Sequence, residues 1–145
     1  MKAFLSSPYA SYIGSEDEAV LAAMRSLVNL QGYLHTVIHV NEVRETDNCV
    51  WSPLVEGQIR LHDRSGVWPW DEAMIWCEFC LEQCGFDTVI IATIPRIKNY
   101  GPNGQDREIT FAKKLGYRIM HEHEVPNDYW SRTSRNAPAT AGASG

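Results

Sequence analysis

Short apolar runs alternate along this chain with longer segments that are apolar on one face only. The runs are rich in β-branched and aromatic residues, as are the central strands of parallel sheets. They span Lys2–Ser6, Cys49–Leu54, Phe86–Ile94 and Tyr117–Met120. We predict a strand at each run, and His121–Val125 can extend the last strand toward a sheet edge.

Between these runs, three segments carry apolar residues at helical spacing. Ser15 and Glu18 have the spacing of a capping box at the start of the first segment. Asp71 is predicted as the N-cap of the second, and Gly116 as the C-cap of the third. The predicted helices run from Ser15 to about Gly32, from Glu72 to about Cys84, and from Gln105 to Leu115.

This alternation predicts one α/β domain, with helices on both faces of a mostly parallel sheet of about four to five strands. We expect a flavodoxin-like three-layer sandwich, in which the first and third strands lie side by side. In such sheets ligands bind at the carboxyl ends of the strands, where the strand order reverses. The Ser6–Tyr9 loop and the helix starts near Asp71 and Glu108 should therefore meet in one crevice.

Two segments fit the alternation less well. Within residues 33–48, Thr36–Val40 fits either a strand or a helix that continues through Val43, and we favour a helical or irregular insertion. Residues 55–66 are polar and are predicted to form a loop of the length used for lids and binding loops. The domain is expected to span residues 1–130, followed by a disordered tail over residues 131–145.

Composition adds limits on partners and location. The chain has 145 residues and a net charge of −5, which argues against a surface for nucleic acid polymers, because such surfaces need clustered Lys and Arg. The first residues turn polar too soon for a signal peptide, and no apolar run is long enough to cross a membrane. We therefore expect a cytoplasmic protein with no membrane partner.

Neither the cysteines nor the histidines predict a metal site. Cys77, Cys80 and Cys84 form a stripe along one predicted helix, so their thiols do not converge, and buried thiols acting as small hydrophobes explain them better. His121 and His123 alternate on a predicted strand, where a solvated edge is the simpler interpretation. We expect no metal and no cofactor.

Four short motifs follow one another in a fixed order. The first is Leu5-Ser6-Ser7-Pro8-Tyr9, similar to an "ASPY" opening, and the second is Val50-Trp51-Ser52-Pro53, similar to "VFSP". The others are Trp68-x-x-Asp71 and Gly104-x-x-x-Glu108, the latter continuing to Ala112 and Leu115-Gly116 like a "GxxxE…A..LGK" segment. Together they resemble the nucleoside 2-deoxyribosyltransferase-like superfamily, in particular its small phage and bacterial members, over most of residues 1–120.

The resemblance implies cleavage of the N-glycosidic bond of a nucleoside or a nucleoside 5′-monophosphate. In that family the glutamate matching Glu108 is the nucleophile on the anomeric carbon, and an aspartate placed like Asp71 helps to handle the base or the nucleophile. Transferases pass the sugar to a second base, whereas hydrolases pass it to water. Members commonly form dimers or larger assemblies, so we expect a homodimer or higher homo-oligomer, in the host cytoplasm if a phage encodes it. We expect substrate contacts from Ser6, Ser7, Pro8, Tyr9, Ser52, Trp68, Asn103 and Gly104.

Aromatic and basic side chains near these motifs suit a nucleotide. Tyr9, Trp68 and Trp70 can stack on a flat base, although core or interface packing explains most tryptophans. Cations can hold a 5′-phosphate, although surface charge is the simpler interpretation of each one. The candidates are Arg60, Arg64, Arg96 and Lys98.

The residues themselves leave alternatives open. Glu108, predicted in the first turn of its helix, should stay ionised there as a nucleophile must, but acids at helix starts are common without any catalytic role. Asp71 can orient the sugar, protonate the leaving base or simply cap its helix. Gln105 stands where several relatives have a small hydroxyl residue, which puts the substrate in question. The alternative function is a non-catalytic nucleotide-binding or phage accessory protein on the same fold.

Overall fold

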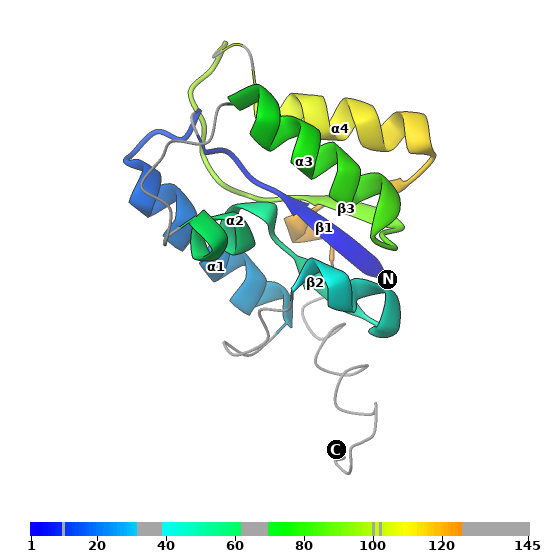
Figure 1. Ribbon diagram of the computed structural model, residues 1–145. Helices are drawn as coiled ribbons and strands as arrows, with labels where there is room; N and C mark the ends of the chain where they lie inside the picture. The colour runs from blue at the N-terminus through cyan, green and yellow to red at the C-terminus, as the bar shows by residue number, and fades with distance from the viewer. Residues whose placement is uncertain (10, 32–38, 62–69, 100, 102, 126–145) are drawn as a thin grey trace.

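The computed structural model describes residues 1–9, 11–31, 39–61, 70–99, 101 and 103–125, without the side chains of residues 58–61. Strands and helices alternate along this part of the chain (Figure 1). The strands are β1 (Lys2–Ser6), β2 (Cys49–Trp51), β3 (Thr88–Ile91) and β4 (Arg118–His121). The α-helices are α1 (Glu16–Gln31), α2 (Pro53–Leu61), α3 (Trp70–Gln83) and α4 (Gly104–Leu115), and two 3-10 helices are η1 (Val40–Glu45) and η2 (Glu122–Glu124).

The four described strands form one parallel sheet with the order β2-β1-β3-β4. β1 and β3 pair from Ala3 opposite Thr88 to Ser6 opposite Ile91, so their carboxyl ends lie side by side. The strand order reverses between these two strands, because the chain moves from β1 outward to β2 and then back to β3. This arrangement confirms the predicted flavodoxin-like α/β architecture.

Helices cover both faces of the sheet and enclose two apolar cores. Figure 1 shows α1 and α2 on one side of the strands and α3 and α4 on the other. Leu5 and Ile90 face α1 and α2, whereas Phe4 and Val89, their neighbours along the strands, face α3 and α4. The alternation follows from the pleat of a strand, which points successive side chains to opposite faces. β1 and β3, which are apolar on both faces, occupy the centre of the sheet.

Helix ends follow the predicted signals at two of the three expected helices. The Ser15 hydroxyl accepts from the Glu18 amide at 3.2 Å, and the Glu18 carboxylate accepts from the Ser15 amide at 2.8 Å. These two bonds form the expected capping box of α1. Helix α4 ends at Gly116, whose φ of 78° lies in the left-handed region that favours glycine.

The predicted polar loop over residues 55–66 is wrong for its first part, because α2 occupies Pro53–Leu61. The second strand is correspondingly shorter than Cys49–Leu54 and ends at Trp51. Pro53 takes the first helical position, where its missing N–H costs nothing, and the Ser52 hydroxyl accepts from the Val55 amide at 3.2 Å. Ser52-Pro53 is therefore a helix start and not the end of a strand.

Three smaller expectations are corrected by the structure. Helix α3 begins at Trp70, so Asp71 lies inside its first turn and is not the N-cap. The last strand ends at His121 and is followed by η2, so it does not continue to Val125. In the insertion, the favoured helical interpretation holds for η1, while residues 33–38 lie outside the described part of the chain. Trp68 and the predicted tail also lie outside it.

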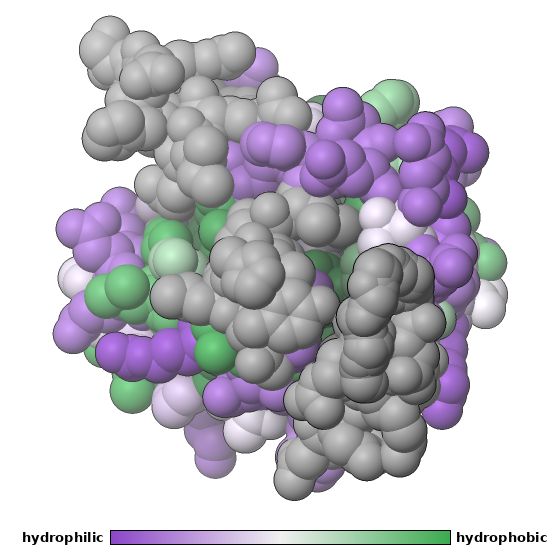
Figure 2. All heavy atoms as spheres, turned by 90° about the horizontal axis from the view of Figure 1, so that it is seen from below, coloured by the Kyte–Doolittle hydropathy of each residue, from purple (hydrophilic) through white to green (hydrophobic). Residues whose placement is uncertain are grey.

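The described surface seen in Figure 2 is largely hydrophilic, with hydrophobic residues gathered in smaller groups. None of the described helices is long and apolar enough to cross a membrane.

Candidate active site

The carboxyl group of Glu108 lies inside the protein at the carboxyl end of β1. Glu108 belongs to α4 and is 6% exposed, and the wholly buried Ser6 closes β1. The Ser6 hydroxyl donates to Glu108 Oε1 at 2.6 Å. Because Ser6 pairs with Ile91 of β3, the carboxyl group sits where the two central strands end. This is the position at which open α/β sheets bind ligands.

Burial raises the pKa of Glu108 from 4.5 to about 7, although hydrogen bonds from Ser6 and Cys77 act in the opposite direction. The negative charge of Glu78 raises the pKa further. This direction is opposite to the expectation that Glu108 stays ionised at neutral pH, because burial favours the protonated carboxyl group. Glu108 lies beyond the first turn of α4, and the helix dipole has little effect at that distance from the helix start. Desolvation therefore determines the direction in which its pKa shifts.

Cys77 is the second partner of this carboxyl group and was not among the predicted site residues. It lies on the buried face of α3, and its thiol lowers the pKa of Glu108, against the effect of burial. Burial, followed by the charge of Glu108, raises the pKa of Cys77 well above its ordinary value. The sequence shows only a cysteine in an apolar stripe, which gives no sign of a carboxylate partner.

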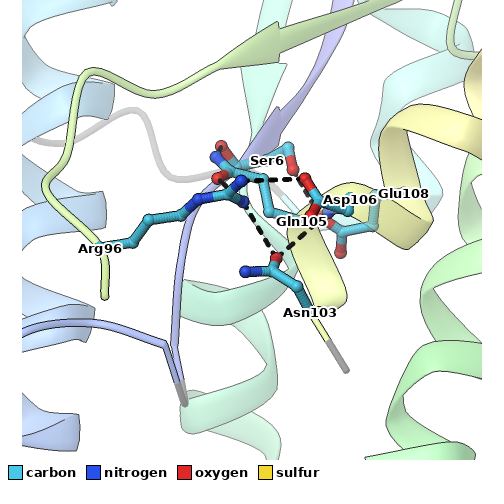
Figure 3. A network of polar contacts seen from close by, with 6 residues as sticks. All are labelled: Ser6, Arg96, Asn103, Gln105, Asp106 and Glu108. Atoms are coloured by element: carbon cyan, nitrogen blue, oxygen red, sulfur yellow. Dashed lines mark hydrogen bonds and ion pairs between the residues drawn. The ribbon is translucent and has the colours of Figure 1, made fainter. Parts of the chain in front are cut away.

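A network of polar side chains ties the β3–α4 loop to β1 beside Glu108 (Figure 3). Arg96 donates to Asn103 Oδ1 at 3.1 Å and to Gln105 Oε1 at 3.0 Å, and it pairs with Asp106 at 3.1 Å. The Gln105 amide in turn donates to the backbone carbonyl of Ser6 at 2.9 Å. Gln105 therefore holds the backbone of Ser6, the residue that donates to Glu108.

Asn103 and Gly104 have clear local roles at the start of α4. The Asn103 side chain is the N-cap and accepts from the Asp106 amide at 3.2 Å. A Cβ atom at Gly104 would lie 3.1 Å from Met74 Sδ and 3.8 Å from Trp70 Nε1. Glycine therefore lets α4 begin close against α3, and these two roles do not require a ligand.

The Ser7–Tyr9 turn follows directly after Ser6. Pro8 is buried and Tyr9 is half-buried, and the Tyr9 carbonyl accepts from the Tyr12 amide at 3.1 Å. The Ser7 hydroxyl oxygen is buried and has no hydrogen-bond partner among the residues that the structure describes. An unpaired buried hydroxyl is costly, so this group favours a polar ligand atom at the turn.

Asp71 is not brought into contact with Glu108. Its side chain is 82% exposed, and Asp71 Oδ1 lies 3.9 Å from Arg107 Nη1. Arg107 is held by two hydrogen bonds to Glu78, at 2.8 and 3.0 Å, and stacks over the Trp70 ring at 5.4 Å. Asp71 therefore lies at the surface beside Arg107 and does not contact the buried carboxyl group.

The other predicted substrate contacts either have a structural role or lie outside the described residues. Ser52 caps α2, and Trp68 lies outside the described residues. The imidazole rings of His121 and His123 stack at 5.4 Å. Within the described residues, no group of three or more His, Cys, Asp or Glu side chains is arranged to hold a metal ion.

A surface hollow of about 370 Å³ lies on the outer side of α3 and α4, and its lining includes Glu78, Arg107 and Lys114. Glu108 is not part of its lining, because it occupies the inner face of α4. The hollow is open, and its lining carries charges of both signs. We therefore place the candidate site at Glu108 and not at this hollow.

Comparisons with protein-family models, with curated proteins and with solved structures find no match to this chain. The chemistry of the site is thus argued from its residues. A carboxyl group with a pKa of about 7 can serve as a nucleophile when ionised and can carry a proton when neutral.

Proposed function

We propose that this protein cleaves the N-glycosidic bond of a nucleoside or nucleoside 5′-monophosphate, with Glu108 as the nucleophile. The observation that supports this proposal most is a buried carboxyl group at the carboxyl ends of β1 and β3, hydrogen-bonded by Ser6. The sequence resemblance supplies the substrate class.

In the proposed reaction the ionised Glu108 carboxylate forms a bond to the anomeric carbon as the bond from that carbon to the base nitrogen breaks. The departing base keeps the bonding electron pair and takes up a proton from solvent. Water then attacks the anomeric carbon, breaks the bond to the Glu108 carboxylate and returns one proton to solvent, which releases the sugar and regenerates the carboxylate. In a transferase a second base takes the place of water.

In this proposal, neighbouring residues orient the Glu108 carboxylate and the substrate. The Ser6 hydroxyl holds Glu108 Oε1, and the unpaired Ser7 hydroxyl is available to a sugar hydroxyl. Pro8 and Tyr9 shape the turn on which the substrate lies. Asp71, exposed at the rim and 3.9 Å from Arg107, takes part only as a contact to the base.

The second candidate is a non-catalytic nucleotide-binding or phage accessory protein. The observation that favours it is the low exposure of Glu108, whose carboxyl group is already bonded to Ser6 and Cys77. In that case the residues around Ser7 would bind a ligand that Glu108 never attacks.

Base release from a panel of nucleosides and their 5′-monophosphates, followed by chromatography, separates the two candidates. We expect the wild type to release free base and Glu108→Gln to be slower by about a thousandfold or more, because the amide is a poor nucleophile. Addition of a second base distinguishes a transferase, which forms a new nucleoside, from a hydrolase.

Glu56→Gln is the matched control for this experiment. Glu56 is also buried, and its Oε1 accepts from Trp51 Nε1 at 2.6 Å and from the Val40 amide at 2.7 Å. A glutamine oxygen keeps both bonds, so we expect turnover within a few-fold of wild type. Equal base release by the wild type and Glu108→Gln, with ligand binding retained, would favour the binding protein.

Assembly and location also follow from the resemblance. The proposal includes a homodimer or higher homo-oligomer, acting in the cytoplasm on a small-molecule nucleoside or nucleotide. Sedimentation equilibrium of the full chain tests the assembly directly, and a single monomeric species at all concentrations would contradict it.

A further inference from the structure

Two buried side chains on one turn of α4 hold Ser6 at the end of β1 (Figure 3). The Gln105 amide nitrogen donates to the Ser6 carbonyl oxygen at 2.9 Å, and the Ser6 hydroxyl donates to Glu108 Oε1 at 2.6 Å. Gln105 and Glu108 are each 6% exposed and stand three residues apart, which places them on the same face of the helix. One turn of α4 therefore binds both the backbone and the side chain of Ser6.

The Ser6 carbonyl oxygen receives a second donor from the neighbouring strand. The Ala92 amide, directly after β3, donates to it at 2.9 Å. A carbonyl oxygen has two lone pairs, so these two donors satisfy it. The Ala92 bond holds Ser6 in the sheet, whereas the Gln105 bond joins the end of β1 to α4, the helix that carries Glu108. The second bond therefore controls whether the Ser6 hydroxyl reaches the carboxylate.

Arg96 determines which way the Gln105 amide points. Its guanidinium donates to Gln105 Oε1 at 3.0 Å. A reversed amide would turn its NH₂ group toward the guanidinium and its oxygen toward the Ser6 carbonyl oxygen, so both contacts would become unfavourable. Arg96 is also bonded to Asn103 and Asp106. The amide orientation is thus fixed by a cation that is itself held in place.

Neither capping nor packing of α4 accounts for the Gln105 side chain. The N-cap is Asn103, whose side chain accepts from the Asp106 amide. A buried amide costs free energy unless its polar atoms are bonded, and those of Gln105 are bonded to Arg96 and Ser6. An apolar side chain of the same length, such as methionine, would fill the space without this requirement. The distinctive contribution of Gln105 is therefore its hydrogen bond to Ser6.

We propose that Gln105 is a positioning residue for Glu108, which holds the end of β1 so that the Ser6 hydroxyl stays bonded to the carboxylate. This inference rests on the proposed function, because it gives Gln105 a role in preparing the nucleophile. Gln105 acts through Ser6, the residue that it binds. Its effect on base release should therefore depend on the presence of the Ser6 hydroxyl.

A double-mutant cycle in the full chain tests this dependence. Gln105→Met keeps the length of the side chain and removes its hydrogen bonds, and we expect kcat for base release to fall about tenfold, with KM changed by less than about twofold. In Ser6→Ala, which lacks the hydroxyl, the same substitution should change kcat by less than about twofold. A purely structural role would give the same loss in both backgrounds. That result, or full activity of Gln105→Met, would overturn the inference.

Asp106→Ala is the matched control, because Asp106 lies on the same turn of α4 and also pairs with Arg96, at 3.1 Å. The substitution removes one contact of Arg96 and leaves the bond from Gln105 to Ser6 in place. We expect kcat within about twofold of wild type, because exposed ion pairs contribute little. A tenfold loss in this control would show that the network as a whole, and not Gln105, holds Ser6, and would contradict the inference.

Titration of the Glu108 carboxyl carbon by ¹³C NMR, assigned with Glu108→Gln, repeats the cycle without turnover. The Ser6 hydrogen bond lowers the pKa of Glu108, so Gln105→Met should raise that pKa when Ser6 is present and leave it unchanged in Ser6→Ala. A coupled titration without base release by the wild type would overturn the proposed function while the contact stands. An uncoupled titration would overturn the positioning role even if base is released.

Thermal melting of each variant confirms that it is folded. If Gln105→Met does not fold, Gln105→Glu takes its place in the cycle. The glutamate keeps an oxygen for Arg96, but its carboxylate cannot donate to the Ser6 carbonyl. We expect the same dependence on the Ser6 hydroxyl, and equal losses with and without that hydroxyl would again overturn the inference.

Discussion

Glu56 and Glu108 are both buried glutamates on helices that cover opposite faces of the sheet, yet their surroundings differ. Glu56 is 1% exposed, and one of its oxygens accepts from an indole N–H and a backbone N–H. These donors are fixed in direction and join α2 to β2 and η1. Glu108 is bonded instead by a hydroxyl and a thiol, groups that can rotate toward a substrate.

The two acids also differ in their place on the sheet. Glu56 lies beside β2, one of the two edge strands of the described sheet, whereas Glu108 lies at the carboxyl ends of the two central strands. Burial alone therefore does not identify a reactive acid in this fold. Our proposal that Glu108 is the reactive acid rests on its donors and on its position at the reversal of strand order.

The largest expected effect is on the pH dependence of stability. The pKa of Glu108 rises from 4.5 to about 7 on folding, so its contribution to stability is fully present below pH 4.5 and is lost as the pH rises through 7. Relative to Glu108→Gln, the wild type should lose about 3 kcal/mol of unfolding free energy across this window. Urea unfolding of both proteins from pH 4 to pH 8 measures the difference. Parallel curves would show that Glu108 titrates as it does in the unfolded chain.

Replacing a glycine by alanine should change the free energy of unfolding by a smaller amount, with opposite sign in the two regions. Gly104→Ala places a Cβ 3.1 Å from Met74 Sδ and should destabilise the fold by about 1 kcal/mol. Gly57→Ala, in α2 next to Glu56, meets nothing within 4 Å and should stabilise it by about 0.5–1 kcal/mol. Thermal unfolding checks both variants. Stabilisation by both would mean that the close contact between α3 and α4 is not constraining.

The sheet could be predicted because its signals are local. Runs that are apolar on both faces and alternate with segments of helical spacing predict a parallel sheet, whatever the conformation of the loops. The missed helix α2 shows where local signals conflict, since Ser52-Pro53 ends an apolar run but also provides an N-cap and a proline at the first helical position. Tertiary packing decides between the two interpretations.

At the site, the order of the elements along the chain predicted that Glu108 lies near Ser6. It could not predict the pKa of Glu108. Desolvation depends on what surrounds the carboxyl group, and Cys77 reaches it from a helix distant in sequence. Asp71 was expected at the same place because both helices start at one sheet edge. The direction of its side chain, toward Arg107 and solvent, is decided by the turn of α3 on which it falls.

The most direct test of the central claim is the capture of a covalent sugar on Glu108. A substrate carrying fluorine at C2′ slows hydrolysis of the glycosyl–enzyme bond, because the electron-poor sugar disfavours the oxocarbenium-like transition state. Intact-mass spectrometry and peptide mapping should show a gain equal to the fluorosugar on the peptide containing Glu108, and none in Glu108→Gln. Base release with no adduct, or an adduct on another residue, would contradict the assignment of Glu108 as the nucleophile.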